Sequence, residues 1–469
     1  MRKTKIVCTI GPASETEETL KELCKAGMNV ARLNFSHGSH EEHLKRINAI
    51  KKVRTELGLP IAIMLDTKGP EYRIGTFAEG KAELNEGDEF IFTTEQIEGT
   101  DKKVSVSYEG LNSELSVGDT ILLNNGLMSF EVTGINGKEI NTKVVIGGVL
   151  TNRKSMSFPG KHIKQKYLSE QDKSDIIFGI ENGVDFIACS FVSVKQDLMD
   201  IHELLNEYNA DNIELIAKIE NQSGFDNIEE ICEACDGIMV ARGDMGVEIA
   251  YEKLPAIQKK LITKCRMLGK RVITATEMLE SMIHNPRPTR AEASDVANAV
   301  YDGTSAVMLS GETAAGSYPV EAVKAMAKIC VSTEQNIKYK KRFYNADIEI
   351  RNDIDAISHS TCGMAIDINA RCIVACTLSG ITARMVSRFR SPVDIIGMTT
   401  NEATWRKLSL SWGVTPEMCE TYPSTDVLFY SAKKVAEKVF NLEKNDKIVI
   451  TGGVSGVSGN TNLIKIDEI

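Results

Sequence analysis

The feature that most constrains this fold is a repeated alternation of short apolar strands with capped helices. It occupies two blocks of the chain, before residue 70 and after residue 164. The first block predicts strands at 4–10, 28–33 and 61–65, and the second at 184–189, 213–218, 237–240, 271–275 and 305–309. Strands that alternate with helices in this way form parallel sheets, and eight such units close a (β/α)8, or TIM, barrel.

The helices between these strands begin at recognisable capping residues. Ser or Thr followed three residues later by Glu is typical of a helix N-terminus, and Gly is typical of its end. The expected starts are Ser14 with Glu17, Ser39 with Glu42, Ser169, and Thr289 with Glu292. The first of these helices should end at Gly27, and the helix after Ser169 should reach Gly183.

Residues 70–164 interrupt the barrel with short alternating segments separated by glycines, which predicts a small all-β insertion. It leaves after the third strand, so it should stand at the carboxyl ends of the barrel strands, where active sites lie, and act as a lid. A charged linker near 338–353 then leads to an α/β unit with strands at 372–377, 393–398, 447–451 and 463–466. We therefore expect a barrel from 1–69 and 165–340, a lid from 70–164 and a C-terminal α/β regulatory domain from 341–469.

Composition excludes several classes of protein. The chain carries 65 Asp and Glu against 55 Lys and Arg, a net charge of −10, which argues against binding to nucleic acid or to an anionic membrane. The longest uncharged stretch, 448–464, is rich in Gly and Ser and predicts a loop between strands rather than a membrane helix. The N-terminus offers no signal peptide, and the eleven cysteines lie mostly in apolar runs, Cys232 and Cys235 being interpreted as core. A cytoplasmic location is expected.

Charged residues follow almost every predicted strand. Glu220 and Asp244 end consecutive strands, so their carboxylates can converge on a hard divalent cation, Mg²⁺ or Mn²⁺. Lys218 lies on the same face of its strand as Glu220, and Arg32 and Arg73 come from strands nearby. A divalent cation surrounded by fixed cations is what phosphoryl transfer requires, because the moving group carries negative charge on its oxygens. The alternative is a set of structural ion pairs at the barrel rim.

A second group of oxygen donors carries only one net charge. Asn34, Ser36, Asp66 and Thr67 follow the second and third strands. Such a set suits a large monovalent cation better than a second divalent one. Asn and Ser after a strand are also common helix caps, so that alternative stands beside the first.

Six motifs resemble those of the pyruvate kinase family, and the resemblance runs over essentially the whole chain. They are TIGPAS at 9–14, RLNFSHG at 32–38, LDTKGPE at 65–71, KIEN at 218–221, ARGD at 241–244 and MLSGETA at 308–314. The resemblance implies transfer of the phosphoryl group of phosphoenolpyruvate to ADP, which gives ATP and pyruvate in the final step of glycolysis. It also implies a homotetramer.

The resemblance further implies roles for individual residues. Mg²⁺ would be held by Glu220 and Asp244, and K⁺ by Asn34, Ser36, Asp66 and Thr67; Glu71 would mark dependence on K⁺. The phosphoryl group would be bound by Arg32, Arg73 and Lys218, and the proton delivered by Thr276 with Ser310 and Glu312. Nucleotide contacts would come from Asn34, His37, Arg73 and Lys154. A helix beginning just after Asp244 is expected to aim backbone N–H groups, including that of Gly243, at the substrate carboxylate.

The C-terminal unit contains a second candidate for anion binding. Hydroxyls and backbone N–H groups of Thr377, Ser379, Gly380 and Thr382 follow a strand and precede a helix that contains Arg384, an arrangement that can hold phosphate. It resembles the effector loop of pyruvate kinases, which the Gly/Ser loop at 451–459 would close over a phosphorylated allosteric effector. The alternative is a tight glycine turn without a ligand.

Some positions depart from the family pattern. Asn124 and Asn125 replace two aspartates in the lid, Ser155 and Met156 replace Gly and Val, Ser193 replaces Arg, and Glu277 replaces Gln. These changes indicate a diverged bacterial-type paralogue. Two other functions remain open at this point: a metal-dependent lyase or aldolase acting on a pyruvate enolate, and a catalytically weakened regulatory protein that binds sugar phosphates.

Overall fold

The centre of the molecule is a closed barrel of parallel strands. The computed structural model describes residues 1–161, 163–422, 424–453 and 461–469. Within these residues eight strands close the barrel in the order β1-β17-β16-β15-β14-β13-β3-β2. They are β1 (Lys5–Thr9), β2 (Val30–Asn34), β3 (Ala62–Asp66), β13 (Phe186–Cys189), β14 (Glu214–Ile219), β15 (Gly237–Ala241), β16 (Arg271–Ala275) and β17 (Ala306–Leu309). The expected (β/α)8 barrel is confirmed.

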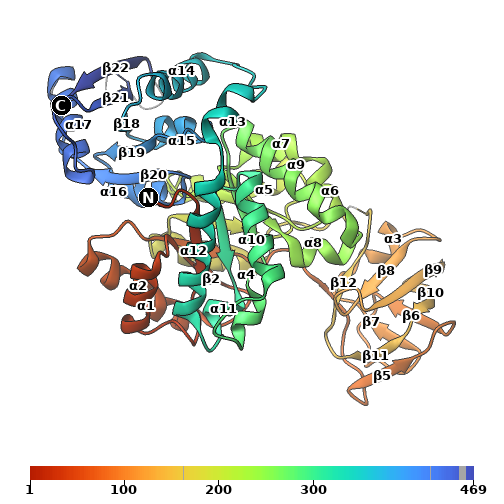
Figure 1. Cartoon of the computed structure of the whole chain (residues 1–469). Helices are drawn as coiled ribbons and strands as arrows, with labels where there is room; N and C mark the ends of the chain where they lie inside the picture. The colour runs from red at the N-terminus through yellow and green to blue at the C-terminus, as the bar shows by residue number, and fades with distance from the viewer. Residues whose placement is uncertain (162, 423, 454–460) are drawn as a thin grey trace.

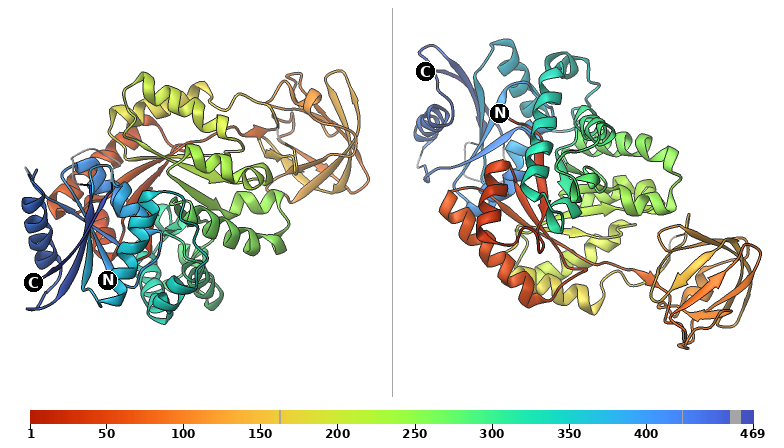
Figure 2. Two further views of the ribbon diagram at one scale, coloured as in Figure 1. Left: turned by 90° about the horizontal axis from the view of Figure 1, so that it is seen from above. Right: turned by 60° about the horizontal axis from the view of Figure 1, so that its bottom comes forward.

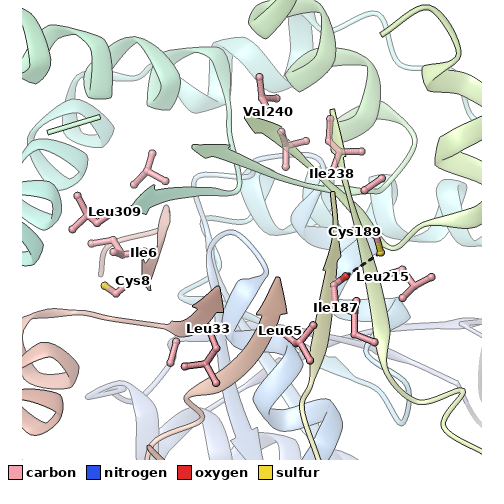
Figure 3. Packing of buried hydrophobic residues seen from close by; sticks show 14 of the residues in the cluster. Ile6, Cys8, Leu33, Leu65, Ile187, Cys189, Leu215, Ile238, Val240 and Leu309 are labelled. Carbon is pink, nitrogen blue, oxygen red and sulfur yellow. Dashed lines mark hydrogen bonds between the residues drawn. The ribbon is translucent and has the colours of Figure 1, made fainter. Parts of the chain in front are cut away.

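The strands are buried on both faces, as parallel barrel strands must be. Side chains that point outward pack under the surrounding helices, among them Leu33, Leu65 and Leu215 (Figure 3). The alternate side chains fill the barrel interior, where Met64 and Met239 lie. Leu410, from the C-terminal part of the chain, joins this interior cluster.

Helices surround the barrel. They are α1 (Glu17–Ala26), α2 (His40–Leu57), α4 (Glu170–Glu181), α5 (Lys195–Glu207), α6 (Gln222–Asp226), α7 (Ile228–Ala234), α8 (Arg242–Glu248), α9 (Leu254–Met267), α10 (Arg290–Asp302), α11 (Gly311–Ala314) and α12 (Pro319–Asn336). No helix in the described part of the chain is long and apolar enough to cross a bilayer.

The predicted helix starts are largely right. The capping boxes of Ser39 with Glu42 and Thr289 with Glu292 are both present, and Ser169 caps α4. The prediction for Ser14 is wrong. Thr16 caps α1 by accepting the N–H of Thr19, while the Ser14 hydroxyl turns back to the backbone of Gly11. Ser14 and Thr16 are both hydroxyl residues that could cap this helix. The Ser14 side chain is already bonded to the turn at Gly11, so Thr16 is the cap.

Residues that follow β3 form the β-rich insertion. A sheet in the order β4-β12-β8-β9-β10-β6-β7 and the pair β11-β5 surround their own apolar cluster, which contains Phe90, Phe92 and Phe130. The strands are β4 (Tyr72–Arg73), β5 (Lys81–Leu84), β6 (Glu89–Thr93), β7 (Lys103–Ser105), β8 (Thr120–Leu123), β9 (Met128–Asn136), β10 (Glu139–Ile146), β11 (Gly148–Thr151) and β12 (Ser155–Ser157), with one short helix α3 (Leu111–Glu114). The insertion projects from one end of the barrel, away from the C-terminal sheet (Figures 1 and 2).

The C-terminal part contains a sheet in the order β20-β19-β18-β21-β22. Its elements are α13 (Tyr339–Asn345), α14 (Asp353–Asp367), β18 (Cys372–Cys376), α15 (Ile381–Ser387), β19 (Asp394–Thr399), α16 (Glu402–Lys407), β20 (Val414–Met418), α17 (Thr425–Val439), β21 (Lys447–Gly452) and β22 (Leu463–Glu468). The four predicted strands are present, but β20 was not predicted. It contains Pro416, which the strand tolerates because it lies at the sheet edge.

This sheet docks on the barrel end opposite the insertion. Arg406 pairs with Asp185 at 2.8 Å, and Lys5 donates to the Val414 carbonyl at 2.6 Å; Asp185 and Lys5 lie at the amino ends of β13 and β1. The carboxyl ends of the strands therefore face the insertion.

Candidate active site

A cavity of about 350 Å³ lies between the insertion and the barrel. Five of the predicted site residues line it, from both sides: Glu71, Arg73, Lys154, Glu220 and Asp244. The barrel contributes the carboxylates of Glu220 and Asp244, and the insertion contributes the cations of Arg73 and Lys154 together with Glu71. The cavity is large enough to hold a small charged substrate.

Lys218 is the buried cation at the barrel side of this cavity. Its Nζ atom lies 3.0 Å from Oδ1 of Asp66, 2.7 Å from the Ser190 hydroxyl and 3.1 Å from Oε1 of Glu220. Burial favours the neutral amine, but the carboxylates of Asp66 and Glu220 outweigh it and raise the pKa of Lys218. Lys218 is therefore a permanent positive charge.

Asp66 holds two cations at once. Its Oδ2 atom accepts from Nε of Arg32 at 2.6 Å, and Nη1 of Arg32 donates to the Thr9 hydroxyl at 2.9 Å. Complete burial would raise the pKa of Asp66, but Arg32 and Lys218 outweigh that effect and lower it. The carboxylate fixes both cations in the barrel interior.

Glu220 and Asp244 lie beside the same cavity. Oε2 of Glu220 accepts the N–H of Phe191 at 2.7 Å, whereas Oε1 is inaccessible to solvent, accepts no hydrogen bond and has Nζ of Lys218 as its ion-pair partner at 3.1 Å. Burial raises the pKa of Glu220 to about 7, against the influence of Lys218, and Asp244 and Asp66 raise it further. Asp244 lies in the first turn of α8.

This pair fits a divalent cation. A buried carboxylate oxygen that accepts no hydrogen bond, beside a second carboxylate, is a hard oxygen donor set of the kind Mg²⁺ prefers. Among the described residues no group of three or more His, Cys, Asp or Glu side chains could hold a metal. The remaining ligands would therefore be water and substrate oxygens, which is how Mg²⁺ is usually bound.

The four residues predicted to hold a monovalent cation meet where β2 and β3 end. Asn34 and Asp66 are register partners, and Thr67 follows directly. Their oxygens already have protein partners: Oδ1 of Asn34 accepts from the N–H of Ser36 at 3.2 Å, and the Thr67 hydroxyl accepts from the N–H of Ser190 at 3.1 Å. A cation here would share these oxygens with backbone donors.

Thr276 lies next to the start of α8. The N–H of Gly243 donates to the Thr276 hydroxyl at 2.7 Å, and that hydroxyl donates to the Ala275 carbonyl at 2.6 Å. Thr276 has a φ of 67°, a conformation that costs energy for a β-branched residue and is common at functional sites. The predicted helix start is wrong: α8 begins at Arg242, so Asp244 lies inside the helix and the N–H of Gly243 is already bonded.

Ser310, Glu312 and His37 do not line this cavity. Both carboxylate oxygens of Glu312 accept backbone N–H groups, from Ser310 at 2.7 Å and from Leu279 at 3.0 Å. His37 is exposed, and its carbonyl accepts from His43 at 2.9 Å. Glu312 thus fixes the backbone after β16 and β17.

One functional contact was missed by sequence reasoning. Ser190 follows β13, and its hydroxyl contacts Lys218 and donates to the Thr67 carbonyl at 2.6 Å. The signal was the same as for the predicted residues, a polar side chain directly after a barrel strand. Among the strand ends from the second onward, that of β13 is the one at which no site residue is predicted.

The positions that depart from the family pattern gather around the cavity. Asn124, Asn125, Ser155, Met156 and Ser193 all line it. Two of them, Asn124 and Asn125, have φ of 52° and 57°, a left-handed conformation that Asn tolerates better than most residues. Glu277 also has a positive φ, 53°, but is not part of the lining.

The predicted effector loop forms a compact turn. The N–H of Gly380 donates to the Thr377 hydroxyl at 2.9 Å, and the Thr382 hydroxyl lies 2.7 Å from that of Thr461. Ser379 is half-buried beside them. Arg384 lies in the helix that follows, as expected, and its guanidinium pairs with Asp236 of the barrel at 3.1 Å. Of the expected closing loop, residues 454–460 lie outside the described part of the chain.

Comparison with known families identifies the chain. Residues 1–323 match the model described as pyruvate kinase, barrel domain, and residues 355–467 match pyruvate kinase, alpha/beta domain. The chain belongs to the pyruvate kinase family. The sequence resemblance is confirmed, and with it the activity: phosphoryl transfer between phosphoenolpyruvate and ADP.

Individual relatives agree. Pyruvate kinase of Bacillus licheniformis is 52% identical over 469 residues, covering 99% of this chain and 80% of that protein, and pyruvate kinase of Geobacillus stearothermophilus is 50% identical over 472 residues, covering 100% and 80%. The crystal structure of a pyruvate kinase from Cryptosporidium parvum superposes with a TM-score of 0.94 at 38% identity, covering 100% of this chain and 96% of that one. The lyase and the purely regulatory protein are therefore set aside.

Proposed function

We propose that this pyruvate kinase uses a divalent cation, Mg²⁺ or Mn²⁺, held by Glu220 and Asp244, to transfer the phosphoryl group of phosphoenolpyruvate to ADP. The observation that carries this proposal is Oε1 of Glu220, which is buried, accepts no hydrogen bond and lies 3.1 Å from Nζ of Lys218, on a side chain that lines the same cavity as Asp244. When bound, the metal would polarise the phosphoryl and enolate oxygens.

In this proposal the protein supplies fixed positive charge where negative charge develops. Lys218 and Arg32, both oriented by Asp66, would stabilise the bridging and enolate oxygens without rearrangement during the reaction. Arg73 would bind the phosphoryl group from the insertion side, held by Nη1 on the Arg153 carbonyl at 2.7 Å.

Closure of the insertion would complete the site. The division into a barrel of 1–69 and 165–340 and a lid of 70–164 is supported by their separate apolar clusters. Lys154 and Arg73 line the cavity from the lid, where we propose that they contact the nucleotide together with Asn34 and His37. Closing would exclude water from the reacting phosphate.

Protonation of the enolate is assigned to the opposite side of the barrel mouth. The Thr276 hydroxyl lies at the first turn of α8, where the carboxylate of the substrate would approach Gly243 and Asp244. Glu312 is proposed to act as a positioning residue, because its two carboxylate oxygens already accept the backbone N–H groups of Ser310 and of Leu279. A proton would then reach the enolate through Ser310 and Thr276.

K⁺ dependence rests on Glu71 and on the oxygens of Asn34, Ser36, Asp66 and Thr67. Glu71 pairs with Arg73 at 2.5 Å on the cavity wall. Its carboxylate therefore holds the Arg73 guanidinium in place, which would otherwise need another acidic partner. We propose that K⁺ binds the four oxygens and orders this wall.

The remaining assignments follow the family. We propose a homotetramer whose C-terminal domain, residues 341–469, is regulatory and binds a phosphorylated effector at Thr377, Ser379, Gly380 and Thr382. A cytoplasmic location is supported by the cysteines, which are all free and almost all buried.

The test is a coupled assay with phosphoenolpyruvate, ADP and Mg²⁺ in either K⁺ or Na⁺. We expect turnover that requires the divalent cation and collapses in Na⁺. Equal turnover in both salts would contradict the K⁺ site, and turnover in excess chelator would contradict the metal site.

A further inference from the structure

A second cavity, of about 330 Å³, lies far from the catalytic mouth, where α13 crosses between the barrel helices and the C-terminal sheet (Figure 1). Its walls come from the ends of α9 and α10, from α13, and from the chain after α15. The barrel and the C-terminal part therefore both contribute to it. Its volume is that of a small-molecule site.

The lining of this cavity is strongly basic. Four arginines face it, Arg266, Arg342, Arg388 and Arg390, against a single carboxylate among the described lining residues, that of Asp302. Asp302 is already occupied by an ion pair with Lys259 and a hydrogen bond from Gln258. The excess positive charge has no counterpart within the cavity.

Three of these arginines have no acidic partner. In the described part of the chain no carboxylate lies within ion-pair distance of Arg266, Arg342 or Arg390, while Arg388 pairs with Asp355 at 3.0 Å. Arg390 instead donates to the carbonyls of Gly303 and Ser387. Arg390 is buried and Arg266 is partly buried, whereas Arg342 is exposed and donates to the Tyr301 carbonyl at 2.7 Å. A buried cation without a counter-ion is costly and rare unless something else neutralises it.

Unsatisfied donors lie among these groups. Nε of Arg266 and Nε of Arg388 are inaccessible to solvent and have no hydrogen-bond partner, whereas Nη2 of Arg388 lies 3.0 Å from Oδ1 of Asp355 in the ion pair. Burial lowers the pKa of Arg390, and the charge of Arg266 lowers it further. A bound dianion would supply both the missing acceptors and the missing charge.

The other lining groups narrow the class of ligand. Tyr339, Phe389 and Trp412 form an aromatic wall, and the guanidinium of Arg390 stacks on Trp412 at 4.8 Å from the ring centroid. Arginine guanidinium groups match phosphate oxygens in geometry, and aromatic side chains favour a flat or apolar moiety attached to them.

We propose that the cavity bounded by Arg266, Arg342, Arg388 and Arg390 is a binding site for a small phosphate monoester. The ligand would touch barrel helices α9 and α10 and the segment after α15 together, so it would fasten the C-terminal part to the barrel. The site is separate from the turn at 377–382, to which none of its lining residues belongs.

The test is calorimetric titration of the full-length protein with three probes: inorganic phosphate, a hexose 6-phosphate and adenosine 5′-monophosphate. The wild-type protein should bind at least one of them. Tighter binding of an ester than of inorganic phosphate would indicate that the aromatic wall contacts the group attached to the phosphate. Equal binding would indicate that free phosphate is the ligand. No binding of any probe would overturn the proposal.

Substitutions of the lining arginines test whether the probe binds in this cavity. Arg266→Gln and Arg342→Gln should each weaken binding at least about tenfold, the usual loss when a charge-assisted hydrogen bond is removed. Arg266→Lys, which keeps the charge, should retain part of the affinity. Lys260→Gln is the matched control: it removes one charge from the same helix α9 outside this cavity, and should bind as the wild type does.

Two further measurements keep the result decisive. Thermal unfolding without ligand should show Arg266→Gln to be no less stable than the wild type, since it removes an unpaired buried charge. The probe should raise the unfolding midpoint of the wild type but not that of the variant. Wild-type affinity in both glutamine variants, with binding lost in Ser379→Ala, would place the anion at the 377–382 turn and overturn the proposal.

Discussion

The Nζ atom of Lys218 lies 3.0 Å from Oδ1 of Asp66, although 152 positions separate the two residues in the sequence. They end strands β14 and β3, and the intervening strand β13 supplies the Ser190 hydroxyl that completes the contact. The barrel register thus creates a fully paired buried cation beside the cavity. Its partners were in place before any substrate binds, which is the condition for electrostatic catalysis.

Replacing Lys218 with Ala should affect both catalysis and folding. We expect kcat/KM to fall at least about 100-fold, the usual effect of removing one preorganised charge-stabilising group. Stability should fall by about 3–5 kcal/mol, because Asp66 and Glu220 would lose their shared buried partner. Steady-state kinetics and urea unfolding measure the two effects.

The matched control is Lys195→Ala, which removes a surface ion pair with Glu233. Such pairs contribute about 0–1 kcal/mol, so this variant should be close to wild type in both measurements. A folded Lys218→Ala protein with full activity would refute the assignment of the active site.

Glu220→Gln should raise the Mg²⁺ concentration needed for half-maximal activity at least about tenfold, since even indirect support of a metal site is usually worth that much. The variant removes the negative charge but keeps the shape of the side chain. Activity is measured against Mg²⁺ at saturating phosphoenolpyruvate and ADP.

Glu248→Gln is the control from the same cavity wall. Burial raises the pKa of Glu248 to about 7, and its carboxylate accepts backbone N–H groups of Gln222 and Phe158. Its Mg²⁺ requirement should be that of the wild type. A shift in Glu248→Gln equal to that in Glu220→Gln would mean that general charge, not direct binding, sets the metal requirement.

Gly69→Ala should damage the connection between the barrel and the insertion. Gly69 has a φ of 70°, and a Cβ atom there would lie 2.8 Å from the carbonyl oxygen and from Cβ of Ser190. Ser190 would have to move, and its hydroxyl contacts Lys218. We expect a loss of about 2–4 kcal/mol in stability, from strain and overpacking together, and a lower kcat.

Gly80→Ala separates the two causes. Gly80 has a φ of 73°, but nothing lies within 4 Å of a Cβ atom at that position. It should lose only about 1–2 kcal/mol of backbone strain and keep its kcat. Equal effects of the two variants would mean that the contact with Ser190 contributes nothing.

The barrel could be predicted because each strand is a short apolar run followed directly by polar residues. The apolar run marks the strand, and the polar residues mark where it ends. The same logic predicted that Glu220, Asp244, Lys218 and Asp66 lie at one barrel mouth, and the structure brings Nζ of Lys218 within 3.1 Å of both Asp66 and Glu220. It could not show where packing between distant parts of the chain directs a side chain: Arg384 adjoins the 377–382 turn in sequence, and its side chain pairs with Asp236 of the barrel. Likewise β20 was missed because Pro416 argues against a strand unless the strand is known to be at an edge.

Lys5 is buried at the opposite end of the barrel, where the C-terminal sheet docks. Burial lowers its pKa from 10.5 to about 7, with Arg2 adding to the effect of burial. The other charged groups that act on it are Lys3, which lowers its pKa, and Glu334 and Asp394, which raise it. Its Nζ atom donates to the Val414 carbonyl.

A lowered pKa in the folded state has a definite consequence for stability. Between about pH 7 and 10.5 the unfolded chain binds more protons at Lys5 than the folded protein, so this residue's contribution to stability rises with pH across that window. Below about pH 7 the folded protein must carry a buried ammonium. Lys5→Met should therefore stabilise the protein by about 1–2 kcal/mol at pH 6.5, and the gain should shrink at pH 9. Urea unfolding of wild type and variant at both pH values measures this. Lys3→Met, which breaks the ion pair of Lys3 with Asp394 at 2.8 Å, is the control and should lose stability at both pH values. A similar loss in Lys5→Met would show that the hydrogen bond from Lys5 to the Val414 carbonyl outweighs the cost of burying its charge.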